Sequence, residues 1–169
     1  MTHPTRVHQR ATAIVAAALM TGGMALATGA TATVASSAGL PADVSSSDQQ
    51  SIVSETNSVR QGAGQSALSW DDSLAKASQA WADDPASTAG GLQHDESVNN
   101  AAENISSSGP TQATGQWASE KSAYDADPDH DSNSVGYKTK WGHYYNMIQP
   151  GYTKIGCGAS AGITVCRYS

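Results

Sequence analysis

Apolar residues are distributed along this chain in three ways, and each predicts a different kind of segment. Residues 11–27 form a nearly unbroken apolar run. From about residue 47 to 148, apolar residues recur every three or four positions, as in helices with one buried face. Two short apolar runs follow, at 154–158 and 163–168, and predict a pair of strands around Ala-Ser-Ala-Gly. Helices followed by strands favour an α+β layered domain.

The helical part divides into four segments. The first begins near Ser47 and ends before Gly62. The second follows Ser69, which has capping-box spacing to Asp72, and ends before Pro85. The stretch that separates the second helix from the third has no regular pattern.

The third and fourth helices lie in the second half of the chain. The third starts at Thr111 and places Trp117, Glu120 and Tyr124 on one face. After an acidic loop, a short fourth helix covers about residues 142–148. The acidic loop alternates aspartates like a calcium-binding loop, but it lacks the glycine and glutamate of an EF-hand, so we interpret it as a solvated loop.

The first residues resemble a secretory signal peptide. Arg6 and Arg10 precede the apolar run, and small residues follow it, so cleavage is expected between residues 27 and 38. A membrane anchor is the alternative, but the run is short and rich in Ala and Gly. We therefore expect an extracellular protein. The predicted signal peptide, disordered linker and single domain are residues 1–35, 36–47 and 48–169.

Charge and cysteine content narrow the function classes. The 169 residues include 9 Lys and Arg against 15 Asp and Glu, and the leader holds no acid, so the exported part is more acidic than the whole. Such a surface repels nucleic acid and anionic membranes. Cys157 and Cys166 are the only cysteines, and in an exported protein we expect them to pair across neighbouring strands.

Two side chains stand out for their surroundings. Glu120 shares a helical face with two aromatic residues, so a buried face would bury its carboxylate, which then needs a donor or a cation. The alternative is a helix-edge acid bound to a backbone amide or a lysine. His143 lies among aromatic residues, where a histidine packed in the core is more common than a metal ligand. His94 and Glu103 taken alone indicate nothing specific.

Together these residues fall in a pattern that resembles the CAP superfamily (cysteine-rich secretory, antigen 5 and pathogenesis-related 1 proteins, or SCP domain). That family has GHYTQVVW, a spacer and VGCG, then VCNY, and upstream HNxxR, LxWD, GEN and WxxExxxY. The similar segments here are NSVR at 57–60, LSWD at 68–71, ENI at 103–105, WASEKSAY at 117–124, GHYYNMIQPGYTKIGCG at 142–158 and VCRY at 165–168.

The resemblance implies a three-layer α–β–α sandwich, with about four helices around a small antiparallel sheet. It also implies a cleft in which His94 and His143 face each other beside Glu103 and Glu120. Paired imidazoles can hold a divalent cation such as zinc or magnesium, and nearby carboxylates can orient the rings. No HExxH motif is present, and no covalent nucleophile on a strand-to-helix elbow is evident.

Four positions depart from the family pattern. Ala102 replaces the Gly before Glu103, Thr56 replaces a histidine of the first helix, and Asn146 and Gln149 replace the Gln and Trp of the signature. These changes affect the rim of the cleft, so they weaken any transfer of ligand specificity rather than the expectation of the fold.

Three functions remain open at this point. The first is a monomeric, non-enzymatic secreted protein that sequesters a sterol or fatty acid, or that engages a host or microbial target. The second is a metal-dependent hydrolase or protease in which His94 and His143 place the cation and Glu103 or Glu120 acts as the base. The third is an extracellular structural module whose cleft is vestigial.

Overall fold

The computed structural model describes residues 44–99 and 101–169. The predicted signal peptide and linker residues 36–43 lie outside these ranges. Helix α1 (Ser46–Gly62) begins inside the predicted linker, because Ser45 caps it by accepting a hydrogen bond from the Asp48 amide. Within the described ranges, no helix is both long enough and apolar enough for a membrane crossing.

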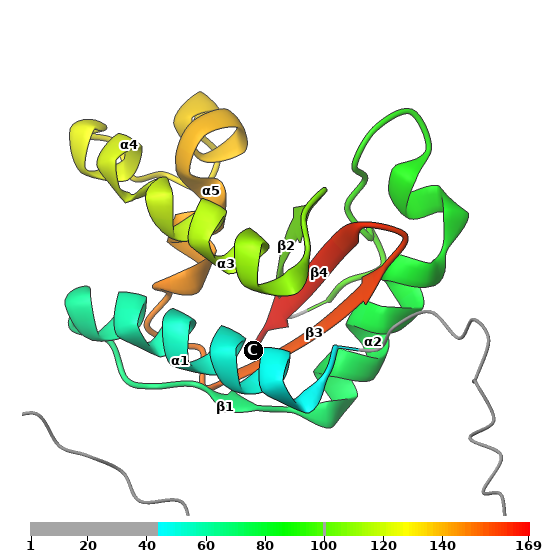
Figure 1. Cartoon of the computed structure of the whole chain (residues 1–169). Helices are drawn as coiled ribbons and strands as arrows, with labels where there is room; N and C mark the ends of the chain where they lie inside the picture. The colour runs from blue at the N-terminus through cyan, green and yellow to red at the C-terminus, as the bar shows by residue number, and fades with distance from the viewer. Residues whose placement is uncertain (1–43, 100) are drawn as a thin grey trace, which may run out of the picture. The chain divides into compact units, whose positions relative to one another are not determined.

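A four-stranded sheet forms the centre of the domain (Figure 1). Its strands are β1 (Ser69–Trp70), β2 (Ala102–Ser106), β3 (Lys154–Ser160) and β4 (Ile163–Tyr168), and their order across the sheet is β1-β3-β4-β2. The pairs β3–β4 and β2–β4 are antiparallel, whereas β1 runs parallel to β3. The sheet is therefore mixed: the predicted antiparallel pairing holds for β2, β3 and β4, whereas β1 is parallel to its neighbour.

Helix α2 (Asp72–Asp83) covers one face of the sheet and lies directly against β3. Gly156 and Gly158 permit this close approach, because a Cβ at either position would overlap backbone atoms of Ala75 or Gln79. The Gly-Cys-Gly segment of the sequence is thus explained by helix packing, with both glycines facing α2.

Helices α1, α3 (Pro110–Ser119) and α5 (Gly142–Met147) cover the opposite face (Figure 1). Their main apolar cluster includes Ile52, Trp117, Met147 and Ile155, all nearly or fully buried. Two faces of one sheet are therefore covered by separate helical layers, which confirms the predicted α–β–α sandwich.

The remaining elements are short. Segment η1 (Pro85–Thr88) is a 3₁₀ turn after α2, α4 (Lys121–Ala126) follows α3, and η2 (Tyr137–Trp141) is a π-helical turn that leads into α5. Neither η1 nor η2 was predicted from the apolar spacing.

Three local predictions need correction. The cap of α2 is Asp71, whose carboxylate accepts from the Ser73 and Leu74 amides, while the predicted cap Ser69 lies in β1. The predicted third helix is interrupted at Glu120, where the Glu120 amide bonds to Trp117 O in a tightened turn. Strand β2 lies within the stretch that was predicted to be irregular, because its mostly polar sequence lacks the apolar pattern of a strand.

A buried arginine joins the helices to the loop before β3. The Arg60 side chain is fully buried, and its guanidinium donates to the carbonyls of Ser66, Met147, Gln149 and Tyr152. Four carbonyl acceptors satisfy the charge without a carboxylate, so Arg60 acts as a structural clamp at the end of α5.

The predicted disulfide is present. Cys157 and Cys166 occupy directly opposed positions on β3 and β4, and their Cα atoms lie 4.1 Å apart. Both half-cystines are buried in the cluster beneath α1 and α3. The bond therefore joins the two central strands inside the core.

Replacing Cys157 by Ser should lower the free energy of unfolding by roughly 2–4 kcal/mol, because the unfolded chain loses a covalent constraint. Urea unfolding of C157S, with Cys157→Ser/Cys166→Ser as the control that leaves no lone thiol, measures this loss. An unchanged urea midpoint in both variants would contradict the prediction.

Candidate functional site

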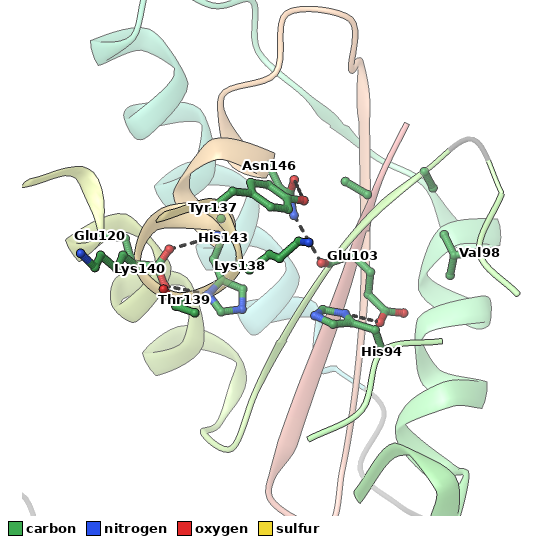
Figure 2. A pocket seen from close by; sticks show the side chains of 13 residues that line it. His94, Val98, Glu103, Glu120, Tyr137, Lys138, Thr139, Lys140, His143 and Asn146 are labelled. Carbon is green, nitrogen blue, oxygen red and sulfur yellow. Dashed lines mark hydrogen bonds and ion pairs between the residues drawn. The ribbon is translucent and has the colours of Figure 1, made fainter. Parts of the chain in front are cut away.

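A cavity of about 440 Å³ opens beside β2, the strand at the edge of the sheet. Side chains from four separate segments line it: the loop before β2, β2 itself, Glu120 between α3 and α4, and the η2–α5 segment (Figure 2). The four residues of the predicted cleft are among them: His94, Glu103, Glu120 and His143.

The first imidazole–carboxylate pair secures the loop before β2. Glu103 Oε1 accepts from His94 Nδ1 at 2.9 Å and from the Asp95 amide at 3.1 Å. The Glu103 side chain is 5% exposed, whereas that of His94 is 58% exposed. A buried carboxylate therefore orients an imidazole that reaches into solvent.

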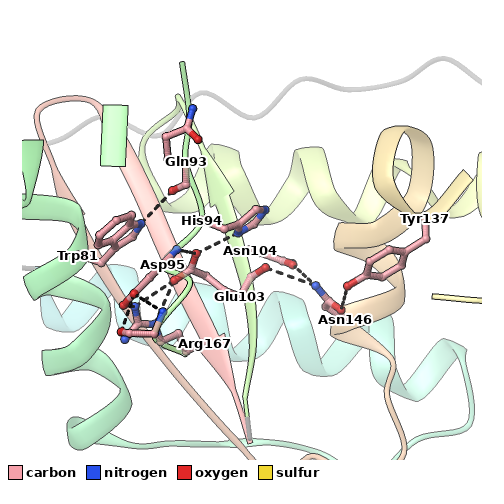
Figure 3. A network of polar contacts seen from close by, with 10 residues as sticks. Trp81, Gln93, His94, Asp95, Glu103, Asn104, Tyr137, Asn146 and Arg167 are labelled. Carbon is pink, nitrogen blue, oxygen red and sulfur yellow. Dashed lines mark hydrogen bonds and ion pairs between the residues drawn. The ribbon is translucent and has the colours of Figure 1, made fainter. Parts of the chain in front are cut away.

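Arg167 neutralises Glu103 from behind the cavity (Figure 3). The guanidinium donates through Nε and Nη2 to Glu103 Oε2, at 3.1 and 3.0 Å, and through Nη2 to Asp95 Oδ2 at 2.6 Å. Burial raises the pKa of the Asp95 carboxyl, but hydrogen bonds from Ser97 and the Arg167 pair outweigh it and leave this pKa below its ordinary value. The Asp95 carboxyl therefore stays ionised at neutral pH.

The second imidazole–carboxylate pair, His143 with Glu120, is held by backbone amides rather than by an arginine. Glu120 Oε1 accepts from His143 Nδ1 at 2.7 Å, and Glu120 Oε2 accepts from the backbone amides of His143 and Tyr144 at 3.0 and 3.1 Å. The Trp117 ring stacks against His143 with ring centres 5.9 Å apart. Glu120 thus binds backbone amides, as expected for the alternative of a helix-edge acid, and it also orients the His143 imidazole.

Both pairs leave the same ring nitrogen available. A carboxylate only accepts hydrogen bonds, so Nδ1 carries the proton in His94 and in His143. In the neutral ring Nε2 then has a free lone pair. Figure 2 shows the two rings on opposite sides of the same cavity, one from the loop before β2 and one from α5.

A chain of side-chain amides joins the two walls (Figure 3). Asn104 Oδ1 accepts from Asn146 Nδ2 at 2.9 Å. Asn104 Nδ2 donates to His143 O and to the Tyr168 hydroxyl. Asn146 Oδ1 accepts in turn from the Tyr137 hydroxyl at 3.1 Å. Consecutive residues of β2 therefore hold opposite walls, with Glu103 fixing the His94 loop and Asn104 fixing α5.

The supporting residues were missed by the sequence interpretation, which did not assign a role to Asp95, Asn104 or Arg167. The signal was present for two of them, since Asn104 follows Glu103 in the ENI segment and Arg167 lies in the VCRY segment. Asp95 lies outside the quoted segments, and its role depends on a contact across the fold.

The fit of a metal ion follows from the donor set. The described part of the chain contains no group of three or more His, Cys, Asp or Glu side chains arranged to hold an ion. Two imidazole Nε2 atoms remain, and two protein ligands are fewer than the three of a typical catalytic zinc site. The residues therefore fit a cation that takes its other ligands from water or from a bound molecule.

The acidic loop is organised by its own backbone. The carboxylates of Asp127, Asp129 and Asp131 each accept from the amide two residues further on, and Asp127 also accepts from Trp141 Nε1 at 3.0 Å. This Trp141 hydrogen bond, followed by the Asp129 amide, lowers the pKa of the Asp127 carboxyl. The alternation of aspartates therefore builds successive turns instead of a calcium loop.

The family to which this chain belongs follows from a comparison with known family profiles. The profile of the CAP family, described as the cysteine-rich secretory protein family, matches residues 53–168. This chain belongs to the CAP family. No curated protein matches it by sequence.

Solved structures share the CAP fold at low sequence identity. A hookworm platelet inhibitor has a TM-score of 0.56 and 16% identity, and the match covers 78% of this chain and 73% of that one. The protein NaASP2, solved with Zn²⁺, has a TM-score of 0.52 and 22% identity, with coverages of 75% and 80%. An extracellular SCP-domain protein of Bacillus anthracis has a TM-score of 0.50 and 17% identity, with coverages of 72% and 40%.

Two departures from the CAP pattern have visible consequences. Asn146, in place of the family Gln, takes part in the amide chain between the walls. Thr56, in place of a histidine, is fully buried, and its hydroxyl has no hydrogen-bond partner among the described residues. The first change alters the cavity lining, whereas the second lies in α1 and away from that lining.

Proposed function

We propose that this chain is an exported, non-enzymatic binding protein whose cleft holds a divalent cation between His94 and His143. The observation that carries the proposal is that both rings line one cavity with Nδ1 bound to a carboxylate, which leaves each Nε2 free as a ligand. Carboxylate-bound imidazoles are the usual arrangement of histidine ligands at metal sites. The leader at residues 1–35 supports export.

Zinc suits this donor set better than magnesium. Imidazole nitrogen is a good ligand for zinc, whereas magnesium prefers oxygen ligands and keeps its waters. The zinc-containing NaASP2 structure shares the fold and makes zinc the natural first ion to test. With two protein ligands the bound ion would remain open to a further molecule, which gives the cleft a binding role.

The character of the cavity favours some ligands over others. Its aliphatic lining is limited to Val98, Ala101 and Ala102, Tyr137 adds an aromatic ring, and most of the other side chains are polar. An amphipathic molecule such as a fatty acid, with its polar end at the imidazoles, fits this lining better than a sterol does. Binding of a host or microbial protein would be a separate function, and it does not depend on the cavity lining.

A hydrolase is less well supported. Glu103 is held by Arg167, His94 and the Asp95 amide, and Glu120 is held by His143 and two amides, so both candidate bases are already engaged. A general base needs a free lone pair within reach of the proton that it removes. Turnover of peptide or ester substrates that a chelator abolishes would nevertheless establish the enzymatic alternative.

Nitrogen-15 spectra of the imidazole side chains test the cation site directly. On addition of one equivalent of ZnCl₂ to the exported chain, the Nε2 resonances of His94 and His143 should shift, while their Nδ1 atoms remain protonated. His130 is the internal control, because its ring stacks on Tyr124 and lies outside the cavity lining. Equal shifts at all three rings, or none, would overturn the proposal and leave a vestigial cleft as the better description.

A further inference from the structure

The cavity contains a lysine that the cation site does not use. The turn η2 contributes Lys138, Thr139 and Lys140 to the lining, next to the imidazoles. In Figure 2 the Lys138 side chain extends from η2 toward β2 and the His94 side of the cavity, whereas Lys140 turns the opposite way, beyond Glu120. The Lys138 ammonium is therefore directed into the space that a ligand would occupy.

This ammonium has no internal counter-ion. Lys121 and Lys154 form ion pairs with Asp125 and Asp71, but no carboxylate pairs with Lys138 within the described part of the chain. The nearest acids of the cavity are already committed, since Glu103 binds Arg167 and His94, and Glu120 binds the start of α5. Lys138 is exposed, and an ammonium that lines a concave site, where the electric field is focused, attracts an anion.

The charges in and directly behind the cavity support the same conclusion. The cations balance the carboxylates one for one, with Lys138, Lys140 and Arg167 against Glu103, Glu120 and Asp95. A divalent cation on the imidazoles would leave a net charge of about +2 on this group. The acidic surface elsewhere does not cancel this local excess, because exposed charges are screened beyond about 10 Å.

We propose that the cleft binds small molecules through a carboxylate group, and that Lys138 is the residue that recognises this group. The inference rests on the proposed function, because the cation on His94 and His143 supplies the second positive charge. A carboxylate has two oxygens that can accept from the Lys138 ammonium, and a cation held by His94 and His143 would attract the same negative charge. The remainder of the ligand then lies toward Val98 and the alanines before Glu103.

Binding of octanoate and methyl octanoate to the zinc-loaded exported chain tests the inference by calorimetry. The two probes have the same apolar chain, and only octanoate carries the charge. Octanoate should bind at least about tenfold more tightly than its ester, because the ester lacks the charge that the ion and Lys138 both attract. Succinate carries the carboxylate charge without the apolar chain, so it separates fatty acids from small water-soluble acids. If octanoate binds and succinate does not, the ligand belongs to the lipid class. If both bind equally, the ligand is a small acid.

Lys138→Met is the decisive variant and Lys140→Met is its matched control, from the same turn with the same loss of charge. The Lys138→Met change should weaken octanoate binding about tenfold and change zinc affinity by less than about threefold, while Lys138→Arg retains most of the affinity for octanoate. Equal affinities for octanoate and its ester, or equal losses in both methionine variants, would overturn the inference.

Failure of the inference and failure of the proposed function give different results. Zinc that binds without any preference for octanoate contradicts only the role of Lys138. If zinc does not bind at all, the cation site is wrong. In that case, octanoate binding that still depends on Lys138 supports the carboxylate site on its own.

Discussion

Replacing Arg167 by Met should lower the free energy of unfolding by about 3–5 kcal/mol, the cost of removing one partner from a buried ion pair. The Arg167 side chain is 9% exposed, and it is the cation that binds both Glu103 and Asp95. Methionine fills a similar volume, so the loss comes from the buried Glu103 carboxylate and the partly buried Asp95 carboxylate, which are left without a counter-ion. Urea unfolding monitored by tryptophan fluorescence measures the effect.

Lys154→Met is the matched control for this variant. Lys154 pairs with Asp71 at 2.8 Å, but its side chain is 51% exposed, and exposed pairs contribute at most about 1 kcal/mol. The same loss in both variants would show that Arg167 is only another surface cation. Because Glu103 also holds His94, we further expect the His94 resonances to move in Arg167→Met and not in Lys154→Met.

The pH dependence of this ion-pair group has a definite sign. The pKa of Asp95 is lower in the folded chain than its ordinary value of about 3.9, so the carboxylate contributes stability that is fully present above that value. The contribution is lost as the pH falls through the lower, folded-state pKa. The stability difference between the wild type and Arg167→Met should therefore narrow below about pH 4.

His143→Ala should weaken zinc binding by more than about a hundredfold. Loss of a residue that merely orients a metal ligand costs about 10–100-fold, so loss of one of only two protein ligands should cost more. Glu120 keeps its hydrogen bonds to the amides at 143 and 144 in this variant, because both come from the backbone. The start of α5 should therefore stay in place, and calorimetric zinc titration should report the missing ligand.

Two comparison variants separate coordination from general disturbance. His130→Ala removes an imidazole outside the cavity lining and should leave zinc affinity unchanged. Glu120→Gln keeps the side-chain shape but removes the charge that orients His143, and should fall within the 10–100-fold range. Zinc affinity that is equal in His143→Ala and His130→Ala would place the ion elsewhere.

The elements that the sequence determined are those with strong local signals. Helices α1, α2 and α5 and the strands β3 and β4 follow from apolar periodicity and from the glycine and proline residues at their ends, since a buried stripe recurs with the period of its own element. The half-cystines could be paired from the sequence because they are the only two, and the strands that carry them were recognisable. The ordered motif segments indicated the family and hence the layers.

Strand β2 could not be predicted, because its residues are polar and its pairing partner β4 lies about sixty positions away. A strand of the sequence Ala-Glu-Asn-Ile-Ser has no clear alternation of apolar and polar side chains. Its stability comes from hydrogen bonds to β4 and from the partners of Glu103 and Asn104 on the two sides of the sheet. Local propensity carries no information about such partners.

Some features of the candidate site could likewise be predicted from the sequence, and others only from the structure. Glu103, Glu120 and His143 were singled out because they fall within recognisable segments, and His94 because it precedes the first of these. The sequence could not tell a helix-edge glutamate from one that orients an imidazole. Only the tertiary structure showed which ring nitrogen each carboxylate binds, that Arg167 and Asp95 stand behind Glu103, and that Lys138 faces the cavity. These contacts join residues distant in the chain, and their energies depend on burial and direction, which the order of residues does not encode locally.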